Sequence, residues 1–236
     1  MTKYISHKAN NRGHANHGWL DSFFSFSFAE YYDPEKMGFG ALRVINDDII
    51  DGGNGFGMHQ HKNMEIITIP LEGELKHKDS KGHEAIIRPG DIQVMSAGSG
   101  IYHSEYNASA DVPAKLLQIW ILPKIANVEP RYNDRTVSNL FEKNTALQIV
   151  SPDQNDGGLW IHQDAWVSMA NYDGDKGFKY DIKKEGNGVY IFLIDGKIKV
   201  EGNLLDSRDA IGIWDTKEVE ISTISDSRMV IFDVPL

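Results

Sequence analysis

The sequence predicts an all-β fold in which one β-unit occurs twice. Short apolar or alternating runs recur along the chain, and each is bounded by Gly, Asp, Asn or Pro, as is typical of sandwiches and barrels. No long stretch repeats apolar residues at helical spacing, so we expect only a few short peripheral helices. The apolar runs are FFSFSF, ALRVI, MEIITIPLEG, AIIRPGDIQVM, KLLQIWILP, VYIFLIDGKIKV, AIGIW and MVIFDV.

The repeat is visible in the order of strands and turns. In residues 66–79 an apolar strand runs into a Glu-Gly turn and an alternating strand, and a Pro-Gly-Asp turn follows. Residues 189–202 repeat this order with an Asp-Gly turn, and SRDAIGIW follows. We therefore predict an N-terminal domain over residues 1–130 and a C-terminal domain over residues 131–236, with the boundary between 125 and 150.

The first of these runs, FFSFSF, alternates strictly. Phe24, Phe26 and Phe28 fall on one face of a strand and Ser25 and Ser27 on the other, because side chains alternate along an extended chain. We expect one core strand here.

Composition and charge restrict the partners. With 236 residues and 41% hydrophobic content the chain can bury a sizeable core. A formal net charge of -10 argues against nucleic acid or an anionic membrane surface as partner, because phosphate binding needs clustered Lys and Arg. The first 18 residues lack the apolar region of a secretory signal, and no run approaches the roughly 20 apolar residues of a membrane span. We expect a cytoplasmic protein.

Two pairs of potential metal ligands stand out in the first half. His59 and His61 are two residues apart, as are His103 and Glu105, so each pair faces one side of its strand. The chain has no cysteine, so any metal must be held by imidazole and carboxylate. This ligand set suits Fe(II), which we prefer, or Mn, Co, Ni, Cu or Zn. Because the second half contains a single histidine, His162, we expect one divalent ion per chain.

The carboxylate ligand has an alternative. Glu65 has an even spacing from His59 and His61 and would face inward if that strand were unbroken. Glu105 shares a face with His103 over a shorter stretch, which favours it as the ligand. We expect Glu65 to be a pocket residue or to orient an imidazole.

The other histidines are predicted to be less important. His14 and His17 are expected to make loop hydrogen bonds, with a place in the pocket as the alternative. His77, His83 and His162 are expected to face solvent or cap local turns.

Residues 53–73 resemble the first motif of the cupin family, and residues 90–107 resemble the second, with Ser96 in place of its proline. Together with GFGMHQHKNMEI, GDIQVMSAGSGIYHSEYN and RGHANHGWLDSFFSFSFAEYYDP, they make the chain similar, over essentially its whole length, to the pirin family and its bacterial quercetinase-like members.

The resemblance implies two tandem cupin (jelly-roll-like) β-barrels, with the metal only in the first. It implies a metal-dependent dioxygenase that cleaves the heterocyclic ring of quercetin-like flavonols with O2, releasing CO and a depside. His59, His61, His103 and Glu105 would hold the metal, and Glu105 would also be the catalytic base.

Two other functions stay open. Pirins also resemble metal-dependent regulators that bind a protein partner, and a cupin isomerase or hydrolase would use the same ligands without oxygen. We expect a monomer, and the residues that bind substrate are not assigned. Apolar candidates for lining the barrel mouth are Phe56, Met58, Met95, Ile101 and Trp120.

Overall fold

Strands make up nearly all of the regular structure in the computed structural model, which describes residues 2–236. Within these residues the helical segments are two single 3-10 turns, η1 (Ala9–Asn11) and η2 (Ser138–Leu140). No helix in this part of the chain is long and apolar enough to cross a membrane. The prediction of an all-β chain with only short peripheral helices is confirmed.

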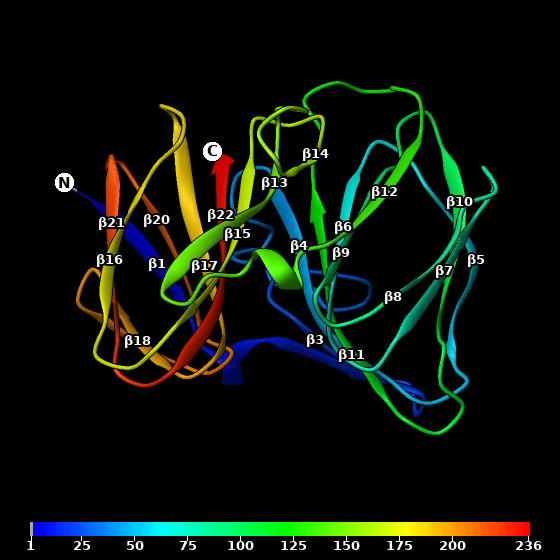
Figure 1. Cartoon of the computed structure of the whole chain (residues 1–236), viewed down its shortest axis with the longest axis horizontal. Helices are drawn as coiled ribbons and strands as arrows, with labels where there is room; N and C mark the ends of the chain where they lie inside the picture. The colour runs from blue at the N-terminus through cyan, green and yellow to red at the C-terminus, as the bar shows by residue number, and fades with distance from the viewer. Residues whose placement is uncertain (1) are drawn as a thin grey trace.

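Two barrels stand side by side, and each consists of one seven-stranded and one four-stranded sheet (Figure 1). The first barrel's large sheet has the order β12-β9-β6-β11-β4-β3-β2 and its small sheet the order β5-β10-β7-β8. The strands of this barrel are β2 (Gly13–Asn16), β3 (Leu20–Phe24), β4 (Leu42–Ile50), β5 (Gly55–His61), β6 (Glu65–Glu72), β7 (Leu75–Asp79), β8 (Glu84–Ile87), β9 (Asp91–Ser96), β10 (Ile101–Asn107), β11 (Ala114–Ile121) and β12 (Arg131–Thr136).

The second barrel repeats this plan. Its large sheet has the order β1-β20-β17-β22-β15-β13-β14, and its small sheet has the order β16-β21-β18-β19. Its strands are β1 (Lys3–His7), β13 (Thr145–Ser151), β14 (Leu159–Trp160), β15 (Trp166–Tyr172), β16 (Gly177–Asp181), β17 (Asn187–Asp195), β18 (Lys197–Val200), β19 (Asn203–Asp206), β20 (Ala210–Trp214), β21 (Glu218–Thr223) and β22 (Ser227–Pro235).

The two predicted copies of the β-unit form strands that pair in the same way in the two barrels. In the first barrel β6 pairs with β9, while β7 pairs with β8 and β10. In the second, β17 pairs with β20, while β18 pairs with β19 and β21. The two β-units read from the sequence are thus copies of one topology.

A single apolar core joins the barrels, because their large sheets bury faces in one common cluster. The cluster draws side chains from both sheets, as sandwiched sheets do. Members from the first barrel include Leu42, Ile67, Val94 and Leu117, and those from the second include Val167, Phe192, Val230 and Phe232.

Two strands cross the predicted division at residue 130. β1 begins the chain but pairs with β20 of the second barrel, where Figure 1 shows it as a blue strand on the left. β12 lies after residue 130 but pairs with β9 of the first barrel. Backbone pairing across the molecule, which has no signature in local sequence, decides both placements.

The prediction for FFSFSF is wrong. β3 ends at Phe24, and the chain then bends. Phe24 and Phe28 line a cavity of the first barrel, whereas Phe26 packs into the core between the barrels, where its ring is 5.3 Å from that of Tyr190. The bend breaks the alternation on which the prediction depended.

Candidate metal centre

The pairing of β5 with β10 sets the histidines opposite one another. His59 lies directly across from His103, and His61 across from Ile101. The register then shifts by one residue, so that Glu105 is opposite Phe56. Such a bulge changes which side chains face inward, and here Phe56 and His59 both line the cavity although their spacing is odd.

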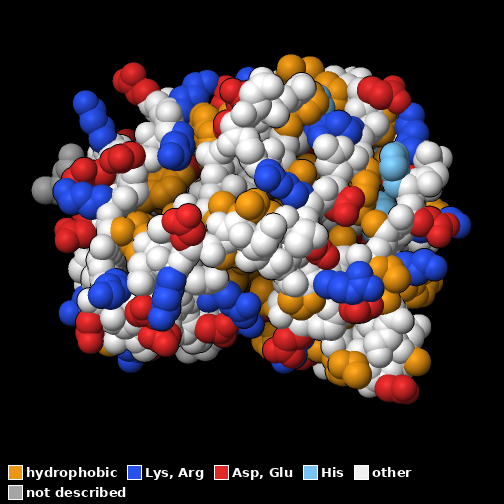
Figure 2. Space-filling model, viewed as in Figure 1, with side chains coloured by type: hydrophobic (Ala, Val, Ile, Leu, Met, Phe, Trp, Pro, Cys, Tyr) orange, Lys and Arg blue, Asp and Glu red, His pale blue; other side chains and the backbone are white. Residues whose placement is uncertain are grey.

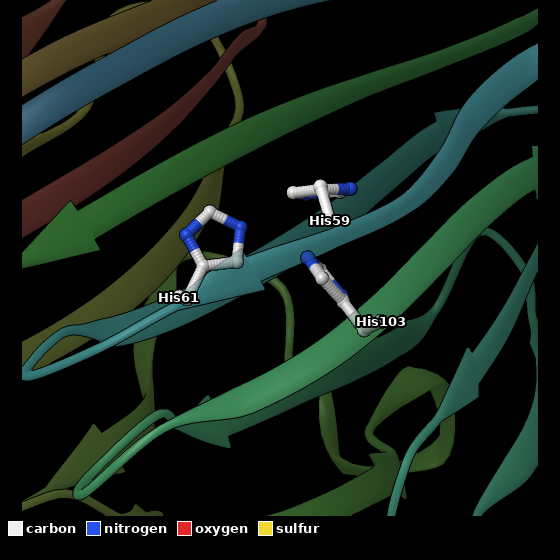
Figure 3. Close-up of side chains that lie close together, drawn as sticks. All are labelled: His59, His61 and His103. Atoms are coloured by element: carbon white, nitrogen blue, oxygen red, sulfur yellow. The ribbon is translucent and has the colours of Figure 1, made fainter.

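His59, His61 and His103 converge on one point. Their ring centroids are 4.4–4.8 Å apart, and one nitrogen from each lies within 4.8 Å of the others. Figure 3 shows the two rings on β5 and the ring on β10 turned toward one another. Three imidazoles at this spacing can share one divalent ion.

His61 and His103 are in the protonation state that a metal requires. Burial lowers the pKa of His61 to about 4 and that of His103 to about 2, and the neighbouring imidazoles add to both shifts. Both are therefore neutral at pH 7 and can offer a lone pair. Both ring nitrogens of His103 are buried without a hydrogen-bond partner among residues 2–236, which fits a group that binds an ion.

Glu105 is a buried carboxylate in the same cavity. Its Oε2 accepts a hydrogen bond of 2.7 Å from Gln118, and its Oε1 is 3.5 Å from both Thr68 Oγ1 and Gln93 Nε2. Burial raises its pKa to about 7 and the charge of Asp48 adds to the rise, while these hydrogen bonds oppose it. One carboxylate oxygen of Glu105, one ring nitrogen of His103 and one ring nitrogen of His77 lie within 4.8 Å of one another.

His59, His61 and Glu105 line a cavity of about 680 Å³. The volume is in the range of small-molecule sites. Its wall combines aromatic rings with polar side chains. The aromatic members are Phe24, Phe28, Tyr31, Phe56 and Trp120, and the polar members include His59, His61, Asn46, Asp48, Glu105 and Gln118.

The outer surface carries mixed charge. On the face drawn in Figure 2, Lys and Arg side chains are interspersed with Asp and Glu rather than gathered in a stripe. A basic stripe is the footprint of a phosphate-backbone partner, and this face does not carry one.

Comparison with known proteins gives the family. Residues 6–121 match the family model described as Pirin, and residues 148–234 match the model described as Quercetinase C-terminal cupin domain. The chain is 46% identical to a protein of Escherichia coli K12 named quercetin 2,3-dioxygenase, over 97% of each chain. This chain belongs to the pirin family.

Two further relatives show the range of names and ligands. A pirin-like protein of Caulobacter vibrioides is 38% identical to this pirin over 94% of this chain and 95% of that protein. The solved structure of the Escherichia coli bacterial pirin YhhW in complex with nickel(II) superposes with a TM-score of 0.93 at 44% identity, covering 99% of each chain. A divalent metal in the first barrel of this pirin is consistent with both the fold and the histidine cluster.

The predicted apolar lining is right at two positions. Phe56 and Trp120 line the cavity. Met58 lies on the outer side of β5 and is 54% exposed, because it alternates with His59. Met95 and Ile101 are buried in an apolar cluster beside the cavity rather than in its lining.

Glu65 is not a residue of the cavity lining. A turn with Asn63 at φ 50° separates β5 from β6, so the even spacing from His59 and His61 does not carry across. Ser96 Oγ donates a 2.6 Å hydrogen bond to Glu65 Oε2, and His162 Nδ1 lies 3.2 Å from Oε1. Glu65 therefore orients an imidazole, but that of His162 rather than of a metal-site histidine.

This contact also corrects the prediction for His162. It was expected to face solvent or cap a local turn, yet it is half-buried against a carboxylate of the first barrel. His162 and Glu65 are far apart in the sequence, and the packing of the two barrels brings them together.

His77 was also predicted wrongly. It is fully buried, opposite Glu105 across the β7 and β10 pair, and its ring stacks on Tyr132 at a centroid distance of 4.6 Å. His83 matches its prediction, since it is exposed and its Nδ1 lies 2.9 Å from Asp79 Oδ2. Alternation along β7, KHKD, is the signal that separates the two histidines.

The amino-terminal histidines lie at the rim of the cavity. His14 Nε2 is 2.6 Å from Asp21 Oδ1, and both His14 and His17 belong to the lining. Sequence reasoning missed Asp48, a buried carboxyl of the wall whose pKa burial raises to about 7, against the hydrogen bond that Ser22 donates to it. The sequence feature that could have pointed to Asp48 is the pair Asp47-Asp48 within the largely apolar strand β4.

Proposed function

We propose that this pirin is a metal-dependent dioxygenase that cleaves the heterocyclic ring of a quercetin-like flavonol with O2, releasing CO and a depside. The observation that supports it is the convergence of the three imidazoles of His59, His61 and His103 beside an aromatic-lined cavity of about 680 Å³, whose wall also contains the buried carboxylate of Glu105. Relatives named quercetin 2,3-dioxygenase support the same chemistry.

His59, His61 and His103 would hold the ion, with Glu105 as the fourth ligand. When bound, the ion supplies a Lewis acid that stabilises the flavonol anion, and a redox-active ion such as Fe(II) also activates O2. Two features of this chain fit a bound ion. Both ring nitrogens of His103 are buried without a partner, and Glu105 places a carboxylate on the same strand.

Glu105 is the base in this proposal. A carboxylate with a pKa near 7 can take the proton of the flavonol 3-hydroxyl at neutral pH. Gln118 holds Oε2 at 2.7 Å, which leaves Oε1, with its two longer contacts, as the atom better placed to receive the proton.

The aromatic wall orients the substrate. Phe24, Phe28, Phe56 and Trp120 offer flat apolar faces beside the histidines, with the Trp120 ring 4.9 Å from that of His61. Such walls suit a planar aromatic ligand.

Oxygen uptake tests the proposal. Metal-loaded protein is expected to consume one O2 per quercetin cleaved and to release CO, whereas a flavone that lacks the 3-hydroxyl is expected to give no uptake. Cleavage of the flavone at the same rate would exclude the role of Glu105 as base. The absence of uptake with every flavonol would exclude the dioxygenase.

A metal-dependent role in binding a protein partner is the second candidate. The observation that favours it is the outer face of the small sheet, where Met58, Tyr102 and Tyr106 are 41–54% exposed directly behind the metal-site strands. A partner whose affinity changes with metal loading, in protein that shows no flavonol turnover, would support this function.

A further inference from the structure

The interior of the first barrel holds a second set of potential ligands behind the three-histidine cluster. His77, His103 and Glu105 each offer one atom, and these atoms lie within 4.8 Å of one another. All three side chains are at most 3% exposed. We propose that they form an inner metal position, distinct from the outer position at which His59 and His61 would join His103 and Glu105.

Cross-strand register builds the inner set. His77 and Glu105 are direct partners in the β7 and β10 pair, and His103 lies two residues from Glu105 on the same inward face. The rings of His77 and His103 are 5.3 Å apart. The inner position is therefore fixed by two neighbouring strands of one sheet rather than by loops.

Unpartnered polar atoms surround this point. Within residues 2–236, both ring nitrogens of His77 and both of His103 are buried without a hydrogen-bond partner, as are Gln93 Oε1 and the Tyr132 hydroxyl. An ion at the outer position binds one nitrogen of His103 and leaves the others unsatisfied. Buried polar atoms without partners destabilise the folded protein, so several in one place point to a bound group.

The charge and chemistry of this region favour a cation. The Asp79 carboxylate lies 3.7 Å from His77 Nε2, and Glu105 contributes a second acidic group. Two imidazoles and one carboxylate are the ligand composition of non-haem Fe(II) sites. We assign the inner position to a first-row divalent cation of this type.

The two positions share His103 and Glu105, so an ion at one excludes an ion at the other. One ion per chain occupies either the outer site, where His59 and His61 line the cavity, or the inner site, where Tyr132 stacks on the ring of His77. The inner position extends the proposed function, but its test does not depend on catalysis.

The test uses Co²⁺ and the full-length apoprotein, with metal content after dialysis and the visible spectrum of the bound ion as readouts. H59A/H61A removes two outer ligands. We expect it to retain one Co²⁺ per chain with a spectrum different from that of the parent, and we expect H59A/H61A/H77A to lose the ion. Because His59 and His61 are half-buried, H59A/H61A is expected to fold. His77 is fully buried, so the H77A triple variant is compared only after its far-UV circular dichroism matches that of the parent.

H59A/H61A/H83A is the matched control, since it removes an exposed histidine close to His77, and it is expected to keep the ion. Loss of all bound Co²⁺ in folded H59A/H61A would overturn the inner position. The buried nitrogens of His77 and His103 would then be satisfied by water. Unchanged binding in the H77A triple variant would overturn it equally. Should H59A/H61A unfold, H59N/H61N gives the same comparison. If only the dioxygenase proposal is wrong, the variants bind Co²⁺ as predicted and the metal-loaded parent shows no flavonol turnover.

Discussion

β10 and β21 hold equivalent places in the two barrels, yet the side chains that they turn inward differ in kind. β10 presents His103 and Glu105, whereas β21 presents Val219 and Ile221. The strands beside them differ in the same way. Where β7 places His77 opposite β10, β18 places Val200 opposite Ile221.

The remaining strand of each small sheet completes the contrast. β5 carries His59 and His61, and its counterpart β16 carries Phe178 and Tyr180. Apolar side chains fill the second barrel, among them Ile191, Ile198 and Ile211, all fully buried. The first barrel instead has two small apolar clusters with a polar region between them.

The difference teaches that the topology does not require a polar interior. A cupin barrel closes equally well around aliphatic side chains, and burying polar groups without partners costs free energy. The polar interior of the first barrel therefore serves binding and chemistry, while the second barrel supplies stability and one side of the shared core.

The largest effect is expected at His103, the histidine that both metal positions share. His103→Ala should abolish stoichiometric metal binding, while the far-UV circular dichroism stays that of the parent because the core is intact. Metal analysis after dialysis checks this. One ion retained per chain would refute the first-barrel site, and two ions bound by the parent would show that the second barrel also contributes ligands.

The next effect is catalytic. Glu105→Gln keeps the size of the side chain but removes its charge and basicity, so flavonol turnover should fall on the order of a hundredfold or more while metal is retained. Steady-state oxygen uptake measures it. Glu65→Gln is the matched control and should lose much less, because Glu65 contacts Ser96 and His162. The reverse pattern would mean that Glu65 is the functional carboxylate.

The filled barrel should respond through stability rather than function. Ile221→Ala removes a fully buried side chain and should lower the free energy of unfolding by about 2–5 kcal/mol with metal content unchanged. Chemical denaturation measures the loss. Ile224→Ala, at a 42% exposed position, is the control and should change stability by about 0.5 kcal/mol or less. Equal effects would contradict the packed interior.

A smaller, pH-dependent effect is expected at the junction of the barrels. Burial lowers the pKa of His7, and Lys36 adds to the shift while Asp33 opposes it. Its Nδ1 is 2.9 Å from the Tyr190 hydroxyl. A neutral His7 therefore contributes stability above the unfolded-chain pKa of about 6.5, and this is lost as pH falls toward the lower folded value.

His7→Gln should consequently flatten the decline of unfolding free energy below about pH 6.5. Denaturation midpoints measured across this pH range give the slope. His17→Gln, on the exposed loop, should leave the slope as in the parent. An identical slope in His7→Gln would show that other groups cause the acid sensitivity.

Much of the architecture could be read from local pattern. Short strands bounded by turn residues indicated an all-β chain, and the matching runs at 66–79 and 189–202 indicated two copies. Alternation along a strand put His59 beside His61. These features depend on residues within one or two strands, so local sequence patterns are enough to predict them.

Tertiary structure decided what depends on distant partners. The turn at Asn63 directs Glu65 toward His162, and strand pairing places the His77 side chain beside Glu105 inside the barrel. The joining of β1 to the second barrel also depends on hydrogen bonds between residues about 200 positions apart. Side-chain alternation is a local property of the backbone. Sheet order, and which of two carboxylates faces the cavity, follow from how separate strands pack, which is a property of the whole chain.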